Sequence, residues 1–190
     1  MPAFDLKSAR HWAEELHNEA IGPGMTVIDA TMGNGGDTER LCRLVGETGR
    51  VIAFDVQAQA VERTRARLEA AGLLARAELH LAGHERVREF VTEPVDAAVF
   101  NLGWLPGGDK SVTTRVETTL AALDGCLALL RPHGLLTVCA YPGHDEGSAE
   151  LARVWEWARD LDGRRFAAME RAYLNQPSAP PVLLAVQRLR

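Results

Sequence analysis

Short apolar runs alternate with helical stretches along most of the chain. Five of these runs are typical of strands: TVIDAT (26–31), RVIAFDV (50–56), AELHLAG (77–83), DAAVFNL (96–102) and LLTVCAY (135–141). Strands this apolar, with helices between them, indicate a parallel sheet whose two faces are both covered.

The clearest helical pattern lies between the fourth and fifth runs, in SVTTRVETTLAALDGCLALL (111–130). Its apolar residues recur at three- and four-residue steps and predict one core-facing stripe: Val112, Val116, Leu120, Leu123, Leu127 and Leu130. The sequence RPHG (131–134) then ends the helix, because Pro and Gly interrupt helices. AQAVERTRARLEAAG (58–72) and SAELARVWEWARDL (148–161) predict two further helices.

The C-terminal part of the chain has a different pattern. Two extended segments, RRFAAMERAYLN (164–175) and PVLLAVQRL (181–189), are joined by a Pro-rich stretch and predict an antiparallel hairpin at one edge of the sheet. We therefore expect an α/β fold of about seven strands, mostly parallel, with helices on both faces. This Rossmann-like layout resembles class I S-adenosylmethionine (SAM)-dependent methyltransferases rather than a simple dehydrogenase domain.

Length and composition add only broad limits. The 190 residues are enough for one domain with a sizeable core, and we expect a single domain at 1–190 with a helical segment at about 1–22. No apolar run approaches the ~20 residues of a membrane span, and the N-terminus lacks the apolar core of a signal peptide. These features predict a cytoplasmic protein with no membrane partner.

Charge and the metal-binding residue types narrow the function further. A net charge of −5 argues against extensive coating of nucleic acid, so DNA binding is not expected. A local basic patch is still compatible with this net charge. Cys42, Cys126 and Cys139 are far apart and predict buried thiols. No H-E-x-x-H motif is present, and we expect no metal.

A glycine-rich loop, GNGGDT (33–38), follows the first strand and precedes a helix. Glycines let the backbone approach a ligand closely, and a helix N-terminus offers unpaired N–H groups. Asp29 ends the strand before the loop, and Asp55 ends the next strand, roughly 20 positions after Gly33, where doubly wound folds place an acid that bonds ribose hydroxyls. The loop therefore predicts a nucleoside site; the alternative is a tight turn with two solvated acids.

The loop sequence favours SAM over a dinucleotide. Asp37 places negative charge where a pyrophosphate would lie, and Thr38 replaces the third glycine of G-x-G-x-x-G. SAM has no phosphate and carries a positive sulfonium, which nearby acids stabilise. An NAD(P)-dependent oxidoreductase is the remote alternative. Gln57 and the pair Gly83-His84 are candidates for contact with the nucleoside, and a solvated loop His is the other interpretation of His84.

The stretch NLGWLPGGDK (101–110) ends the fourth strand at the sheet edge where doubly wound folds bind ligands. Asn101 and Trp104 have the offset found in amino-methylating enzymes of this fold, although Leu102-Gly103 replaces the usual Pro-Pro. An Asn oxygen can accept an amine N–H and so aim the nitrogen lone pair at a methyl group roughly 3–3.5 Å away. The aromatic face can steady a base or a developing cation.

Deprotonation of the amine is the remaining requirement. An alkylamine with a pKa of ~10.4 is almost entirely protonated at pH 7, so the site must lower that pKa or remove the proton. His144, in YPGHDEG after the fifth strand, is the nearest candidate base. A loop His or a substrate contact is the alternative.

Several signatures together resemble one family: VIDATMGNGGDT, FDVQ, NLGWLPGGDKSVTT, YPGHDEG and LNQPSAPP. They resemble the bacterial tRNA 5-(aminomethyl)-2-thiouridine methyltransferases, from about Gly22 to the C-terminus. The resemblance implies a class I fold, SAM as donor, and methylation of the aminomethyl nitrogen on the wobble uridine in a tRNA anticodon loop. Gly36, where relatives often have His, and Gly83, where Ser is common, depart from the pattern.

The resemblance also implies site residues. On the donor side these are Asn34, Gly35, Asp37, Asp55, Gln57 and His84, in addition to Asp29, Gly33 and Gly83 from the strand ends and the loop. On the acceptor side they are Asn101, Trp104, Asp109, Lys110 and His144. The connection between the last two strands adds Asn175 and Gln176 as substrate-side residues. Arg115, close in sequence to Lys110, is a further substrate-side candidate. The alternative interpretation of Asp109 and Lys110 is that they form a turn and a helix cap. A homodimer is implied as well; rRNA or another RNA as substrate, and a non-catalytic SAM- or RNA-binding protein, are the alternative functions.

Overall fold

A computed structural model describes residues 6–105, 107, 113–143 and 145–190. The seven strands are β1 (Thr26–Asp29), β2 (Arg50–Asp55), β3 (Ala77–Leu81), β4 (Val95–Asn101), β5 (Leu130–Ala140), β6 (Phe166–Arg171) and β7 (Val182–Arg188). The α-helices are α1 (Ala9–Ala20), α2 (Gly36–Val45), α3 (Ala58–Ala70), α4 (Val87–Phe90), α5 (Val116–Leu129) and α6 (Asp145–Arg159), with short 3₁₀ turns at Leu74–Arg76 and His84–Arg86.

All seven strands join one sheet in the order β3-β2-β1-β4-β5-β7-β6. The first five run parallel, whereas β7 is antiparallel to both of its neighbours, β5 and β6. The predicted seven-stranded, mostly parallel sheet with an antiparallel C-terminal hairpin is confirmed. The reversal of chain order between β1 and β4 creates the kind of switch point at which open α/β sheets bind ligands.

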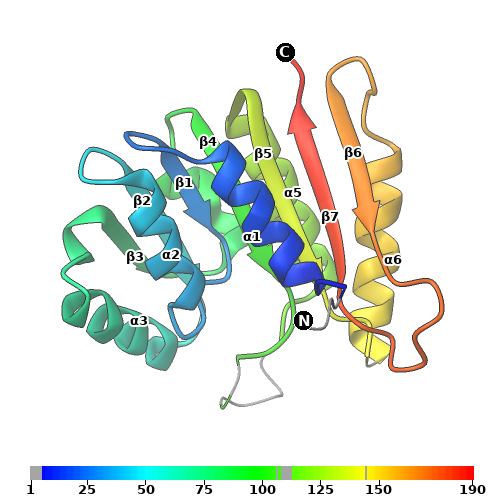
Figure 1. The fold of residues 1–190 in the computed structure, drawn as a ribbon, viewed down its shortest axis with the longest axis horizontal. Helices are drawn as coiled ribbons and strands as arrows, with labels where there is room; N and C mark the ends of the chain where they lie inside the picture. Colours follow the sequence, from blue (N-terminus) through cyan, green and yellow to red (C-terminus); the bar gives the residue numbers. More distant parts are fainter. Residues whose placement is uncertain (1–5, 106, 108–112, 144) are drawn as a thin grey trace, which may run out of the picture.

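Helices cover both faces of the sheet, as Figure 1 shows, with α1 and α2 in front of the strands and α5 and α6 behind them. Side chains of neighbouring strand residues point to opposite faces, so each strand contributes to both layers. Ile28 packs in the core beneath α5 and α6, while the adjacent Val27 packs in the core beneath α2 and α3. A third, smaller cluster holds α1 against β5 and β7 through Ala9 and Ala13.

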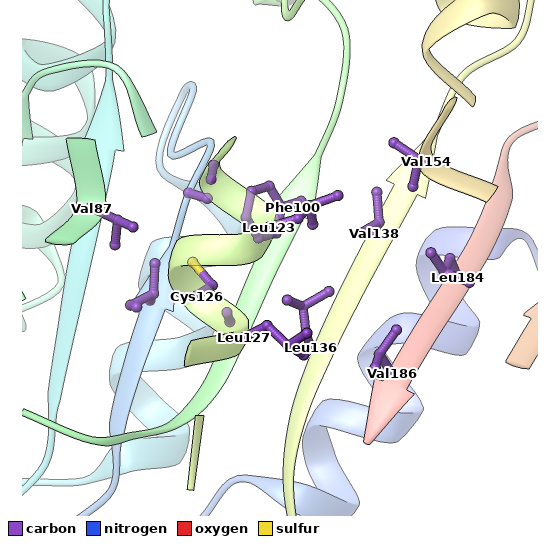
Figure 2. Close-up of a cluster of buried hydrophobic side chains, with 14 of the residues drawn as sticks. Val87, Phe100, Leu123, Cys126, Leu127, Leu136, Val138, Val154, Leu184 and Val186 are labelled. Atoms are coloured by element: carbon purple, nitrogen blue, oxygen red, sulfur yellow. The ribbon is translucent and has the colours of Figure 1, made fainter. Parts of the chain in front are cut away.

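The larger core lies between α5 and the centre of the sheet. Figure 2 shows Leu123 and Cys126 of α5 beside Phe100 of β4, with Leu136 and Val138 of β5 on the next strand. The predicted buried side of this helix is confirmed at Leu123 and Leu127, whereas Leu120 is only partly buried. All three cysteines are buried free thiols, as predicted, and burial raises the pKa of Cys126 to about 12.

The ends of α5 differ from the sequence expectation. The helix begins at Val116 rather than at residue 111, because Thr113 pairs with Trp104 and Thr114 bonds to Gly103 instead of continuing a helix. At the other end, β5 begins at Leu130 instead of residue 135. The RPHG sequence interrupts the helix as expected, but it is absorbed into a strand with an irregular register opposite Val95.

Candidate functional site

A cavity of about 870 Å³ opens at the carboxyl edge of the parallel strands. Residues that end or follow β1, β2, β3, β4 and β5 line it together with one residue of α1 and the segment that leads into α5. Most of the predicted donor and acceptor residues are among them: Gly33, Asn34, Asp37, Asp55, Gln57, Gly83, His84, Asn101 and Trp104. The sheet topology therefore brings together positions as far apart in sequence as Gly33 and Trp104.

Asp55 braces the glycine-rich loop from the end of β2. Its Oδ2 accepts the Gly33 N–H at 3.0 Å, and its Oδ1 accepts the Gln57 N–H at 2.9 Å. Burial raises the pKa of Asp55, and these backbone donors oppose the shift. A carboxylate can accept about four hydrogen bonds, so Asp55 keeps acceptor capacity toward the cavity that it lines.

Gly35 has a packing role behind the same loop. Its φ of 78° lies in the left-handed region, and a Cβ there would stand 2.8 Å from Thr64 Oγ1 and 2.9 Å from Thr64 Cα. Only glycine permits this approach of the loop to α3. Gly35 is absent from the cavity wall, so the structure places this predicted donor residue one layer away from the ligand space.

Asp29 likewise lies behind the cavity wall. It is fully buried, and its carboxylate accepts the Thr38 hydroxyl at 2.7 Å and the Thr31 N–H at 3.2 Å. Burial, followed by the negative charge of Asp37, raises the pKa of Asp29 to about 7. Asp29 is therefore not placed for the predicted direct contact with the methyl donor. It instead links the end of β1 to α2.

Asn101 ends β4 at the cavity wall, and its contacts set the orientation of its amide. Its backbone N–H donates to Thr31 Oγ1 at 2.7 Å, and its side-chain Nδ2 donates to Asp37 Oδ2, also at 2.7 Å. Because a carboxylate oxygen only accepts, this bond assigns the nitrogen to Asp37 and leaves Oδ1 on the other side. Within the described part of the chain, Asn101 Oδ1 is buried with no hydrogen-bond partner.

Two arginines hold the other oxygen of Asp37. Arg10 Nη2, from α1, lies 3.4 Å from Asp37 Oδ1, and Arg40 Nε lies 3.8 Å from it. Asp37 in turn raises the pKa of Arg10. Asp37 thus connects α1, α2 and the end of β4, and its position at the cavity wall is fixed from both sides.

His84, in the turn after β3, contributes a defined acceptor to the cavity. Its Nδ1 lies 3.1 Å from the carbonyl oxygen of Ala30, which can only accept, so Nδ1 carries the proton. Burial lowers the pKa of His84, which keeps the ring neutral near pH 7. The remaining nitrogen, Nε2, is then an acceptor in a residue that lines the cavity.

The remaining predicted residues have different positions. Trp104 lines the cavity and is 40% exposed, whereas His144, Asp109 and Lys110 lie outside the described residues. Asn175 and Gln176 are exposed in the connection before β7, which begins opposite the end of β5 and hence at the cavity edge of the sheet. Neither of them is part of the cavity wall.

Among the cavity-lining residues that sequence reasoning missed are Arg10 and Tyr141. Tyr141 follows the last residue of β5, so the strand-end rule that selected Asn101 would also have found it. Arg10 had no comparable signal, because only the packing of α1 on β5 and β7 brings it to Asp37.

Two absences apply to the described residues only. They contain no group of three or more His, Cys, Asp or Glu side chains arranged to hold a metal ion. Across residues 6–105, 107, 113–143 and 145–190, none of the helices is long and apolar enough to cross a membrane.

Comparisons with known proteins agree with this geometry. The sequence model of the family described as "Putative rRNA methylase" matches residues 51–187. An Arabidopsis thaliana protein named tRNA (mnm(5)s(2)U34)-methyltransferase, chloroplastic, is 36% identical over 195 residues, which cover 97% of this chain and 71% of that protein. The Klebsiella pneumoniae C-methyltransferase UbiE is 30% identical over 118 residues, and the match covers only 43% of its length.

Solved structures show the same relationship. A Clostridium thermocellum "putative rRNA-methylase" has a TM-score of 0.95 and 37% identity, covering 97% of this chain and all (100%) of that one. A Streptococcus mutans "putative methyltransferase" in complex with SAH has a TM-score of 0.89 and 36% identity, with the same coverage. These similarities confirm the predicted class I methyltransferase fold.

The burial of Asp29 predicts a pH-dependent stability. Its folded-state pKa of about 7 exceeds the ordinary value of 3.8, so the folded protein holds this proton where the unfolded chain has lost it. The stability contributed by the protonated form is present below pH ~4 and is lost as the pH rises through 7. Relative to an Asp29→Asn variant, the wild type should lose on the order of 4 kcal/mol of unfolding free energy across this range.

Urea denaturation of both proteins at half-unit steps from pH 4.5 to pH 8.5 measures this difference. A gap between wild type and variant that does not change with pH would show that Asp29 is ionised in the folded protein.

Proposed function

The chain belongs to the "Putative rRNA methylase" family, and we propose that it methylates the aminomethyl nitrogen of 5-aminomethyl-(2-thio)uridine at the wobble position of tRNA, with SAM as the methyl donor. The observation that carries this proposal is the Asn101 amide, whose Nδ2 is bound to Asp37 and whose buried Oδ1 lacks a partner in the described chain. Asn101 lines the cavity, and an amine N–H that reached this oxygen would supply its missing partner. The name of the Arabidopsis relative supports tRNA as the carrier of that amine.

The residues on the donor side fit SAM. Asp55 retains acceptor capacity for ribose hydroxyls, and His84 Nε2 is an acceptor that suits the exocyclic amine of adenine. Asp37 supplies negative charge at the cavity wall, which stabilises a sulfonium and disfavours a pyrophosphate. Bound SAM supplies an electrophilic methyl group at this site.

The residues on the acceptor side orient the amine. In our proposal Asn101 Oδ1 accepts one N–H of the neutral amine, which leaves its lone pair aimed along a fixed direction. Asp37 prevents the amide from rotating, because rotation would set Asn101 Oδ1 against a carboxylate oxygen. Trp104, half exposed at the wall, offers a face on which the uracil ring stacks.

The substrate ammonium must lose a proton before attack. The pKa of a free alkylamine is ~10.4, and the partly closed cavity favours the neutral amine by removing it from water. His144 remains our proposed proton acceptor, following the end of β5 in sequence. Asp109, Lys110, Asn175 and Gln176 remain proposed RNA contacts.

rRNA is the second candidate substrate, and one observation favours it: the family is described as "Putative rRNA methylase".

The homodimer and the cytoplasmic location inferred from the sequence stay predictions.

The direct test supplies the protein with SAM and tRNA that carries unmethylated 5-aminomethyl-2-thiouridine, followed by nuclease digestion and mass spectrometry of the nucleosides. We expect one methyl group to be added to the aminomethyl nucleoside. Unmodified tRNA and rRNA are run in parallel. Methylation of rRNA with an unchanged tRNA nucleoside would replace the proposed substrate, and SAM binding without any transfer would indicate a non-catalytic protein.

Asp55→Ala should abolish donor binding, because the ribose hydroxyls lose their acceptor and the Gly33 N–H loses its anchor. Isothermal titration with SAM measures the affinity. Glu78→Ala is the matched control, since Glu78 is an acid on neighbouring β3 that pairs with Arg50 outside the cavity. Micromolar affinity in Asp55→Ala would exclude its proposed role.

Asn101→Ala should lower turnover by ~10²-fold or more, while SAM affinity stays within about two-fold, because only the positioning of the amine is lost. Single-turnover methyl transfer to tRNA and SAM titration give the two values. Asn18→Ala, on the exposed side of α1, is the control. A parental rate in Asn101→Ala would contradict the proposed lone-pair orientation.

A further inference from the structure

Glu150 of α6 is a buried carboxylate beside the connection from β4 to α5, which carries Gly103, Trp104 and Thr114. It is 4% exposed and is absent from the cavity wall. A buried carboxylate is costly unless hydrogen-bond donors compensate it. Glu150 has two such donors: Thr119 Oγ1 binds its Oε1 at 2.6 Å, and Thr114 Oγ1 binds its Oε2 at 2.7 Å.

The Thr114 hydroxyl extends this arrangement to the end of β4. While it donates to Glu150, it accepts the Gly103 N–H at 3.0 Å. The Thr114 N–H donates back to the Gly103 carbonyl oxygen at 3.2 Å, and the next pair, Trp104 and Thr113, forms an antiparallel bridge. The two sides of the loop are thus joined at their base, and the joint rests on Glu150.

Gly103 is the position at which the joint affects the site. It lies two residues after Asn101 and immediately before Trp104, so its conformation sets the direction in which the chain leaves the strand. Its φ of 126° is a conformation that side-chain-bearing residues rarely adopt. A flexible residue with an unusual φ needs external contacts to hold it, and Thr114 provides two of them.

We propose that Glu150 is a positioning residue for the acceptor half of the site: through Thr114 it fixes Gly103, and through Gly103 it fixes Trp104 relative to Asn101. This inference rests on the proposed function, because it assigns the substrate side of the cavity to these residues. Glu150 itself touches no substrate. Its carboxylate reaches from α6 to Thr114, which lies in the connection between β4 and α5.

Only a group with two acceptor oxygens, such as the Glu150 carboxylate, can accept from both threonine hydroxyls in this way. Two hydroxyls each donate to a separate oxygen of Glu150. An amide has one oxygen and one NH₂ group, so in Glu150→Gln one threonine must turn its proton away and accept instead. Whichever threonine turns, its own hydroxyl proton loses the acceptor that Glu150 provided.

Thr119 allows a test that cannot involve direct substrate contact. It is fully buried and outside the cavity wall, so Thr119→Val removes one donor from Glu150 without changing the cavity surface. Thr119→Ser keeps the hydroxyl and is the matched rescue variant. For both Glu150→Gln and Thr119→Val we expect the kcat/KM for tRNA to fall about 10-fold or more, with the SAM Kd within about two-fold of wild type.

Asp96→Asn controls for loss of stability alone. Asp96 accepts the Thr26 N–H at 2.8 Å and pairs with Arg131, close to the amino end of β4 and far along the strand from Asn101. This variant should lower the melting temperature and leave both tRNA kinetics and SAM affinity unchanged. If Glu150→Gln weakens SAM binding as much as it weakens tRNA turnover, its role is general stability and the positioning proposal is overturned.

Amide hydrogen exchange tests the joint independently of any activity. In Glu150→Gln the Gly103 and Thr114 amides should exchange faster, while the Ala98 and Phe100 amides in the middle of β4 keep their protection. If the wild-type protein methylates no tRNA, the proposed function is wrong. If exchange at Gly103 is unchanged in Glu150→Gln, Glu150 does not hold Gly103 through Thr114 and the structural part of the proposal is also wrong. A wild type that is active, with variants that match it in kcat and KM, would overturn only the positioning role.

Discussion

The hydrogen bond from Asn101 Nδ2 to Asp37 Oδ2, 2.7 Å long, determines what the end of β4 presents to the cavity. Without it the Asn101 amide has two orientations of similar shape, and only the observed one leaves Oδ1, an acceptor, without a partner in the described chain. Arg10 and Arg40 hold the other oxygen of Asp37, so the orientation depends on two helices as well as on the strand. The fixed amide is the basis on which we propose an amine as substrate.

Each half of the proposed site is supported from behind by a buried acid that lies outside the cavity wall. On the donor side, buried Asp29 links Thr31 and Thr38, and so holds the strand end against the helix that follows the glycine-rich loop. On the acceptor side, Glu150 links α5 and α6 to the loop after β4. A methyl transfer that depends on direction requires such rigid backing, because small displacements of the reacting atoms reduce rates strongly.

The sequence predicted the strands, their parallel arrangement and the polar residues that end several strands at the cavity, since apolar runs and the polar residues that end them are local features. It could not separate residues at the wall from those behind it. Asp29 and Gly35 belong to the same motif as Gly33, yet burial and the close approach of α3 set them one layer back. Glu150 had a weak signal, an acid four residues before Val154 on the buried side of its helix, and its partners came only from the fold.

The most direct test of the central claim is a crystal structure of the protein with SAH and an anticodon stem-loop that carries 5-aminomethyl-2-thiouridine. We expect Asn101 Oδ1 to lie within about 3 Å of the aminomethyl nitrogen, with Nδ2 still bound to Asp37. An aminomethyl nitrogen held by another group, or an Asn101 amide turned away from Asp37, would contradict it.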